Sequence, residues 1–212
     1  MIDTPLFKMT TLDDELTNVL NINNYEISGY CRYYKFYMDI AYTAQDGDIF
    51  VEIGSFLGQS SAIMGYMIKY LNKDIKFHCV DLFKTSDFSD PIHFDHVNGD
   101  FYQTFLDNMK NANIDNIISH QMSSKEASRL FEDNSLKFVF LDASHIYEDV
   151  CNDIKYWWPK IESGGVLGGD DYDWIDVSLA VEDTLLKSKK IMIVYTPTYE
   201  NQTISTWHVN KP

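Results

Sequence analysis

Acidic side chains stand directly after two apolar segments in the second half of the chain. Asp142 follows Phe138-Val-Phe-Leu, and Asp170 and Asp171 follow Gly-Gly-Val-Leu-Gly-Gly. Carboxylates that converge in a largely buried cleft repel one another unless they are protonated or bridged by a cation. Oxygen ligands without cysteine suit a hard ion, so we expect Asp142, Asp170 and Asp171 to bind Mg²⁺, with Mn²⁺ or Ca²⁺ as alternatives. In the competing interpretation, Asp170 and Asp171 form a solvated turn.

A histidine follows the first of these acids at the predicted start of a helix. His145 comes three residues after Asp142. A neutral imidazole beside an ionising hydroxyl can accept its proton, so His145 is the candidate general base. The structural alternative is that His145 packs at the helix start or orients Asp142. His93 and His96 are the next candidates, in a long segment, residues 84–100, that we interpret as a lid over the site.

A glycine turn in the first half of the chain predicts a second functional region. The sequence Glu52-Ile-Gly-Ser-Phe-Leu-Gly-Gln-Ser60 follows an apolar strand and leads into a helical pattern. Glycines let a ligand approach the backbone, and free N–H groups at a helix start favour a polar or anionic group. Gln59 stands where a phosphate loop needs lysine, and the glycine spacing is not that of a dinucleotide fingerprint. The cofactor-binding candidates are Glu52, Gly54, Ser55, Gly58, Ser60, Asp81, Ser124 and Asp142.

Asp81 ends the next apolar strand, Phe77-His-Cys-Val-Asp81. Its distance from the glycine turn is typical of an acid that accepts hydrogen bonds from ribose hydroxyls. A helix-capping or strand-end acid is the simpler alternative. Ser123 and Ser124 open a later helix, either as N-caps or facing an adenine ring.

Alternating strand and helix patterns position all these residues. We expect strands at residues 49–53, 75–81, 117–121, 138–142, 166–169, 191–196 and 203–209. Helices are expected at residues 12–20, 29–44, 59–71, 102–111, 125–131, 146–157 and 177–187. Such alternation predicts an α/β fold with a mostly parallel sheet and helices on both faces, with functional residues at the carboxyl ends of the strands.

Together these motifs resemble a known family. Val-Glu-Ile-Gly-Ser-Phe-Leu-Gly-Gln-Ser, the Val80-Asp81 strand end, Leu-Asp-Ala-Ser-His-Ile-Tyr-Glu and Gly-Gly-Val-Leu-Gly-Gly-Asp-Asp-Tyr are similar to segments of class I S-adenosylmethionine (SAM) methyltransferases. The likeness is to the small family that includes macrocin-type sugar O-methyltransferases, and it covers about residues 29 to 209.

The resemblance implies a Rossmann-like, doubly wound sheet of seven strands with an antiparallel last strand, and SAM as methyl donor. It also implies, as in several members, a Mg²⁺ ion held by carboxylates like Asp142, Asp170 and Asp171, and a base placed like His145. Relatives often carry His-Asp-Tyr where this chain has Asp170-Asp171-Tyr172, which adds a carboxylate and leaves open whether Asp170, Asp171 or both bind the ion.

Composition limits the partners. The 212 residues fit one domain, residues 1–212, with an N-terminal helical cap at residues 1–45. The net charge of −15 disfavours nucleic acid and anionic membranes. Cys31, Cys79 and Cys151 lack metal-type spacing and read as reduced thiols. Without a recognisable signal peptide or a membrane-spanning run, a cytoplasmic location is expected.

The sequence therefore predicts a metal-dependent O-methyltransferase that acts on a hydroxyl of a small-molecule sugar or a glycan. Tyr30–Tyr37, Tyr172 and Trp174 could stack on a sugar face, although aromatic residues at helical spacing are more often core. A catechol-like or phenolic acceptor is the first alternative, and a non-catalytic SAM-binding module is the second. The identity of the acceptor and the oligomeric state, including a homo-oligomer, stay open.

Overall fold

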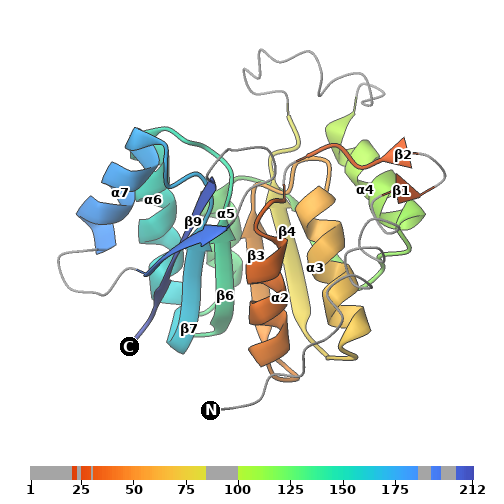
Figure 1. The fold of residues 1–212 in the computed structure, drawn as a ribbon, viewed down its shortest axis with the longest axis horizontal. Helices are drawn as coiled ribbons and strands as arrows, with labels where there is room; N and C mark the ends of the chain where they lie inside the picture. The colour runs from red at the N-terminus through yellow and green to blue at the C-terminus, as the bar shows by residue number, and fades with distance from the viewer. Residues whose placement is uncertain (1–20, 23–24, 30, 85–99, 186–191, 197–203) are drawn as a thin grey trace.

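The main feature of the computed structural model is a seven-stranded sheet (Figure 1). The structure describes residues 21–22, 25–29, 31–84, 100–185, 192–196 and 204–212. The strands of the main sheet are β3 (Ile49–Ile53), β4 (Lys76–Asp81), β5 (Ile117–Gln121), β6 (Leu136–Leu141), β7 (Ile161–Gly169), β8 (Met192–Thr196) and β9 (Ile204–Asn210). A separate two-stranded hairpin, β1 (Asn21–Ile22) with β2 (Tyr25–Glu26), precedes them.

The strand order is β5-β4-β3-β6-β7-β9-β8. Strands β3 to β7 pair in parallel, whereas β9 is antiparallel to both β7 and β8, as expected for the last strand. The chain moves outward from β3 in one direction through β4 and β5, and then returns to β6 on the other side of β3. This reversal makes the carboxyl ends of β3 and β6 a topological switch point, where open α/β sheets bind ligands.

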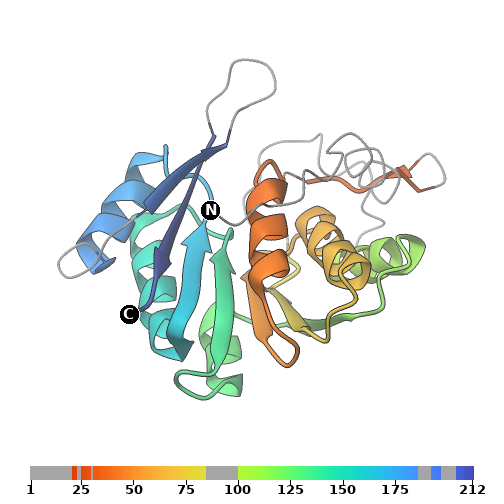
Figure 2. The ribbon, with the colours of Figure 1, turned by 60° about the horizontal axis from the view of Figure 1, so that its bottom comes forward.

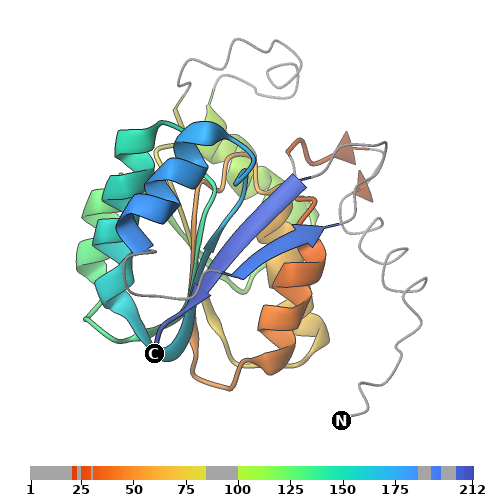
Figure 3. The same cartoon turned by 60° about the vertical axis from the view of Figure 1, so that its left-hand side comes forward.

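Helices cover both faces of the sheet, which confirms the expected α/β fold (Figure 3). One layer contains α2 (Tyr34–Thr43), α3 (Gln59–Tyr70) and α4 (Phe101–Asn111). The other contains α5 (Ser124–Ala127) with the 3₁₀ turn η2 (Ser128–Leu130), α6 (Tyr147–Trp157) with η3 (Trp158–Lys160), and α7 (Ile175–Leu185). Figure 2 shows α2 and α3 side by side on their face of the sheet.

Alternation along the strands produces two cores. Phe50 and Phe138 point toward α2, α3 and α4, and their neighbours Val51 and Val139 point toward α5, α6 and α7. All four side chains are fully buried, as the period of two in a strand covered on both faces requires. One polar exception lies on the α2 side, because Glu52 takes the position between Phe50 and Gly54.

Several element boundaries differ from the expectations. Strand β6 ends at Leu141, β7 begins at Ile161, and α7 begins at Ile175. The expected helix at residues 12–20 and most of the expected lid, including His93 and His96, lie outside the described residues. The three cysteines are buried and free, as expected. In the described part of the chain, every helix is too short or too polar to cross a membrane.

Candidate active site

The turn after β3 follows its sequence pattern and lies against the end of β6. Gly54 and Gly58 both have φ of 95°, a left-handed conformation that favours glycine. A Cβ on Gly54 would lie 1.9 Å from the carbonyl oxygen of Asp142. We expected glycine here because of a ligand, but the structure gives a different first reason: the backbone of β6 leaves no room for a side chain.

Glu52 lies behind this turn, without solvent exposure. It accepts a 2.9 Å hydrogen bond from the Tyr37 hydroxyl at Oε1, and the Ser61 hydroxyl donates to Oε2. Burial raises the pKa of the Glu52 carboxyl, and the hydrogen bonds from these hydroxyls act against that shift. Glu52 therefore links α2 to the start of α3, the helix that directly follows the glycine turn. Ser60 is also buried nearby.

Asp81 reaches the same turn from β4. Its Oδ2 accepts a 2.8 Å hydrogen bond from the Phe56 N–H, and its Oδ1 accepts one of 2.6 Å from the Phe83 N–H. Both donors belong to residues with positive φ, 46° at Phe56 and 49° at Phe83. Burial raises the pKa of Asp81 despite these backbone donors. Each carboxylate oxygen keeps acceptor capacity for a further donor, such as a diol hydroxyl.

A surface hollow of about 560 Å³ lies beyond Asp81. It is lined by Leu82, Lys84, Gln121, Met122, Glu126 and Leu130. We did not predict these residues. The sequence pattern that could have indicated them is their position at the carboxyl ends of strands: Leu82 directly follows β4, and Met122 directly follows β5.

The two serines at the start of α5 have separate roles. Ser123 is the N-cap, with a capping box to Glu126, so the expected cap is confirmed. Ser124, a cofactor-binding candidate, donates a 2.5 Å hydrogen bond to Asp153 and accepts one of 2.8 Å from Trp157 Nε1. Both hydrogen-bond partners of the Ser124 hydroxyl therefore lie in α6. Ser55 differs, because its buried hydroxyl has no hydrogen-bond partner among the described residues.

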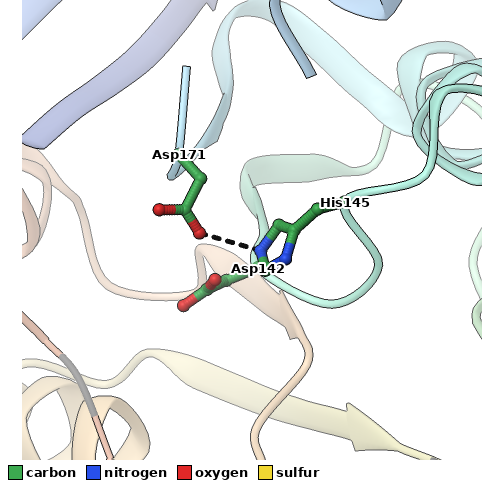
Figure 4. Close-up of side chains that lie close together, drawn as sticks. All are labelled: Asp142, His145 and Asp171. Carbon is green, nitrogen blue, oxygen red and sulfur yellow. Dashed lines mark ion pairs between the residues drawn. The ribbon is translucent and has the colours of Figure 1, made fainter. Parts of the chain in front are cut away.

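The second functional region lies at the ends of β6 and β7. Asp142, His145 and Asp171 each offer a ligand atom, and these atoms lie within 4.8 Å of one another (Figure 4). His145 Nε2 is 2.8 Å from Asp171 Oδ2. The contact lacks the alignment of a hydrogen bond and is an ion pair only when the imidazole is protonated. Nε2 is buried with no hydrogen-bond partner in the described part of the chain. Contact with Asp171 raises the pKa of His145, and burial acts in the opposite direction.

Asp170 has a different environment from Asp171. Its Oδ1 accepts a 3.1 Å hydrogen bond from Thr206 of β9, and it is outside the cluster of Asp142, His145 and Asp171. Burial, followed by the charge of Asp171, raises the pKa of Asp170 to about 7. Burial and the charge of Asp170 hold the pKa of Asp142 well above its usual range. The charge of a neighbouring acid therefore adds to the effect of burial at both Asp142 and Asp170.

A small cavity adjoins these acids. Its volume is about 10 Å³, near the lower limit for one water molecule, and its lining includes His145, Asp153, Asp170 and Trp207. The indole of Trp207 is 1% exposed, and its Nε1 has no partner among the residues that the structure describes. The centroid of the Trp174 ring lies 4.8 Å from that of the His145 imidazole, and Trp174 is 54% exposed.

Comparison with known proteins agrees with this geometry. A family model described as a methyltransferase domain matches residues 51–172, which include the glycine turn, Asp81 and the acids of β6 and β7. The chain belongs to this methyltransferase family. Its fold, turn and strand-end acids together define a SAM-dependent methyltransferase. No curated protein is similar enough to the chain to count as a relative.

Solved structures show the same fold at low identity. A putative O-methyltransferase from Klebsiella pneumoniae is 12% identical, with a TM-score of 0.63 over 93% of this chain and 90% of that one. A cofactor-bound protein from MTB is 12% identical, with a TM-score of 0.63 over 99% and 92%. An rRNA methylase from Streptococcus thermophilus is 12% identical, with a TM-score of 0.60 over 87% and 98%.

Proposed function

We propose that this chain is a metal-dependent O-methyltransferase that acts on a hydroxyl of a sugar or glycan. The observation that carries the proposal is the meeting of Asp142, His145 and Asp171 at the switch point of the sheet. Asp142 lies against Gly54 through its carbonyl group, so the acid cluster and the glycine turn share one rim. A methyl donor and a hydroxyl acceptor held on the two sides would meet there.

The glycine turn and Asp81 would hold the donor. SAM supplies an electrophilic methyl group when bound. Asp81 would accept hydrogen bonds from the ribose hydroxyls while it keeps its two backbone donors. The hollow beside Leu82 and Met122 would take the adenine ring, since it opens directly after Asp81 and has both apolar and polar lining residues. Glu52 would support the donor site indirectly, by bonding to α2 and to the start of α3 beside the turn.

The acid cluster has the properties that a divalent cation requires. Asp142 and Asp170 hold a proton more tightly than isolated carboxyls would, because burial and the charge of a neighbouring acid raise the pKa of each; that neighbour is Asp170 for Asp142 and Asp171 for Asp170. A cation held by Asp142 and Asp171, with Asp170 beside them, would offset this repulsion. When bound, it would lower the pKa of an acceptor hydroxyl. Mg²⁺ is the first expectation and Mn²⁺ the alternative.

His145 would accept the proton of the acceptor hydroxyl. Nε2 lies 2.8 Å from Asp171 Oδ2, so a proton taken there lies beside a carboxylate that stabilises the imidazolium. Alignment of the hydroxyl oxygen with the donor methyl group would supply much of the remaining acceleration. The exposed ring of Trp174 beside His145 offers a flat surface for an acceptor ring.

The net charge of the chain separates a sugar acceptor from RNA. Some structures of the same fold are described as rRNA methylases. With a net charge of −15, this chain would repel a polyphosphate backbone. A neutral sugar hydroxyl carries no such penalty. A phenolic acceptor would use the same acids and is therefore an outcome of the test below.

The test is an acceptor screen with SAM and Mg²⁺, in which mass spectrometry detects the gain of one methyl group. The screen contains nucleotide sugars, neutral glycan fragments and catechols. We expect methylation of a sugar hydroxyl, loss of activity in EDTA, and recovery with added Mg²⁺ or Mn²⁺. Methylation of catechols alone would move the acceptor class to phenols.

Asp142→Asn supplies the variant for this screen, with Asp183→Asn on α7 as its control. Asp183 is an exposed acid that accepts a hydrogen bond from Tyr147. We expect Asp142→Asn to behave like the chelated enzyme and Asp183→Asn to behave like the wild type. Full turnover in EDTA, together with an active Asp142→Asn variant, would refute the metal role.

A further inference from the structure

Two buried tyrosines at the start of α2 point into the sheet below the site. Tyr33 is the N-cap residue of α2, and Tyr37 follows it one helical turn later. Both side chains are fully buried, and their ring centroids lie 5.0 Å apart. Both rings also pack against Phe140 of β6. Their spacing of four residues places them on one face of α2. Figure 2 shows that α2 packs over the sheet.

Each tyrosine donates a hydrogen bond to a different acid. The Tyr33 hydroxyl lies 2.7 Å from Asp142 Oδ2, and the Tyr37 hydroxyl lies 2.9 Å from Glu52 Oε1. Asp142 belongs to the acid cluster after β6, and Glu52 belongs to the strand that leads into the glycine turn. One face of α2 is therefore connected to both functional regions, through separate hydroxyl groups.

We propose that Tyr33 and Tyr37 are positioning residues, which orient the acid cluster and the donor turn independently. This inference rests on the proposed function. Tyr33 fixes one oxygen of Asp142 and leaves the other oxygen without a side-chain donor among the described residues. Tyr37 fixes Glu52 beneath the turn, so that its second oxygen can accept from Ser61 at the start of α3. Partners of this kind orient metal ligands and cofactor loops without touching the ligand themselves.

The two acids depend on their tyrosines to different degrees. Glu52 keeps the Ser61 donor if Tyr37 loses its hydroxyl. For Asp142, Tyr33 is the one side chain that donates a hydrogen bond within the described residues. A buried carboxylate that loses its donor is free to rotate or to take up a proton. Removal of the Tyr33 hydroxyl should therefore have the larger effect.

The test compares Tyr33→Phe with Tyr37→Phe, because phenylalanine keeps the ring packing and removes only the hydroxyl. Tyr102→Phe is the control, since among the described residues the Tyr102 hydroxyl bonds to Ser119 and to no acid. Isothermal calorimetry measures SAM affinity, and electron paramagnetic resonance measures Mn²⁺ affinity, each without turnover. Thermal unfolding is recorded for every variant.

We expect a crossed result. Tyr33→Phe should weaken Mn²⁺ binding by about 10- to 100-fold and leave SAM affinity unchanged. Tyr37→Phe should weaken SAM binding by roughly two- to tenfold and leave Mn²⁺ affinity unchanged. Tyr102→Phe should change neither affinity.

Other outcomes separate the inference from the function on which it rests. Wild-type protein that binds neither SAM nor Mn²⁺ would refute the proposed function itself. Wild-type protein that binds both, with both affinities unchanged in the two variants, would overturn only the inference. Equal loss of both affinities in both variants, with lower melting temperatures, would also overturn it, because the tyrosines would then only stabilise α2. Donor binding without ion binding in the wild type would overturn the Tyr33 half.

Discussion

The glycine turn after β3 and the acid cluster after β6 and β7 lie side by side, yet their polar groups are satisfied to different degrees. Around the turn, Glu52 and Asp81 each have both oxygens paired with protein donors. In the cluster, burial, followed by the charge of neighbouring Asp170, raises the pKa of Asp142, and His145 Nε2 has no hydrogen-bond partner in the described part of the chain.

This difference suggests different tasks for the two regions. A turn whose acids are already paired keeps its shape without a ligand, so it is preorganised for a donor that only has to fit. A cluster of acids that repel one another is complete only when a cation or protons join it. Substitutions on the donor side should therefore change shape and affinity, and those on the acceptor side should change chemistry.

The largest expected effect is on the chemistry of the acceptor side. His145→Ala should lower kcat by about 10²–10⁴-fold, the range of a lost general base, with SAM affinity nearly intact. Single-turnover kinetics at saturating Mg²⁺ and calorimetry with SAM measure the two quantities. A small loss that excess Mg²⁺ rescues would mean that His145 only orients Asp142 or the ion.

The backbone contact between the two regions can be broken at Gly54. Gly54→Ala should destabilise the protein by about 1–3 kcal/mol beyond the cost of its positive φ, because the new Cβ would meet the carbonyl oxygen of Asp142. Gly47→Ala is the matched control, since Gly47 has φ of 92° and nothing within 4 Å of its Cβ position. Urea denaturation measures both variants. Equal losses would show that the end of β6 yields to the added methyl group.

Asp81 tests affinity on the donor side. Asp81→Asn should weaken SAM binding by about 1.5–3 kcal/mol, as expected for lost charge-assisted hydrogen bonds, while the Mn²⁺ affinity of the acid cluster stays the same. Calorimetry and electron paramagnetic resonance again separate the two readouts. A variant with wild-type SAM affinity would remove Asp81 from the donor site and leave it as a loop-binding acid.

The smallest expected effect concerns a histidine pair outside both regions. His78 Nδ1 and His120 Nε2 lie 2.8 Å apart, and burial, followed by the charge of His120, lowers the pKa of His78 to about 4. In the folded state the two imidazoles therefore stay neutral, whereas in the unfolded state they bind protons below about pH 6.5. The pair therefore lowers the free energy of unfolding as the pH falls from about 6.5 toward 4.

A double variant isolates the contribution of the histidine pair to the pH dependence of stability. The acids with raised pKa act in the opposite direction, because the folded state binds protons that the unfolded state has released, so they add stability over the same pH range. Urea denaturation at pH 7 and pH 5 should show a smaller loss, or a larger gain, on acidification for His78→Gln/His120→Gln than for the wild type. Identical pH dependence would mean that the pair is not a source of it.

Local patterns predicted much of the fold. Strands β3 and β5 have the expected bounds, because short apolar runs between turn residues specify them. The start of β7 was missed because Glu162-Ser-Gly-Gly165 has the composition of a turn, although the strand passes through it with a register irregularity opposite Leu136 and Phe138. The two-residue strands β1 and β2 are too short to show periodicity.

The candidate site was predictable where it depends on strand ends, and less so where it depends on side-chain packing. Asp142, His145 and Asp171 converge as expected because parallel strands end at one rim. The bonds from Tyr33 to Asp142 and from Thr206 to Asp170 join distant segments, and no local spacing encodes them. Whether Ser55 and Ser60 contact a cofactor, and whether Asp170 binds metal, stay predictions.

The positions of Tyr33, Tyr37 and Thr206 also bear on what counts as the working unit of this enzyme family. The segment that family comparison recognises, residues 51–172, carries Glu52, Asp142 and Asp170. Three of the hydroxyl groups that donate hydrogen bonds to these acids, those of Tyr33, Tyr37 and Thr206, come from before and after that segment. A chimera that joins residues 51–172 to the flanking segments of another protein would keep the acids but lose the hydroxyl groups of Tyr33, Tyr37 and Thr206 that bond to them. Inventories of homologous enzymes built on such segments would overlook the same residues.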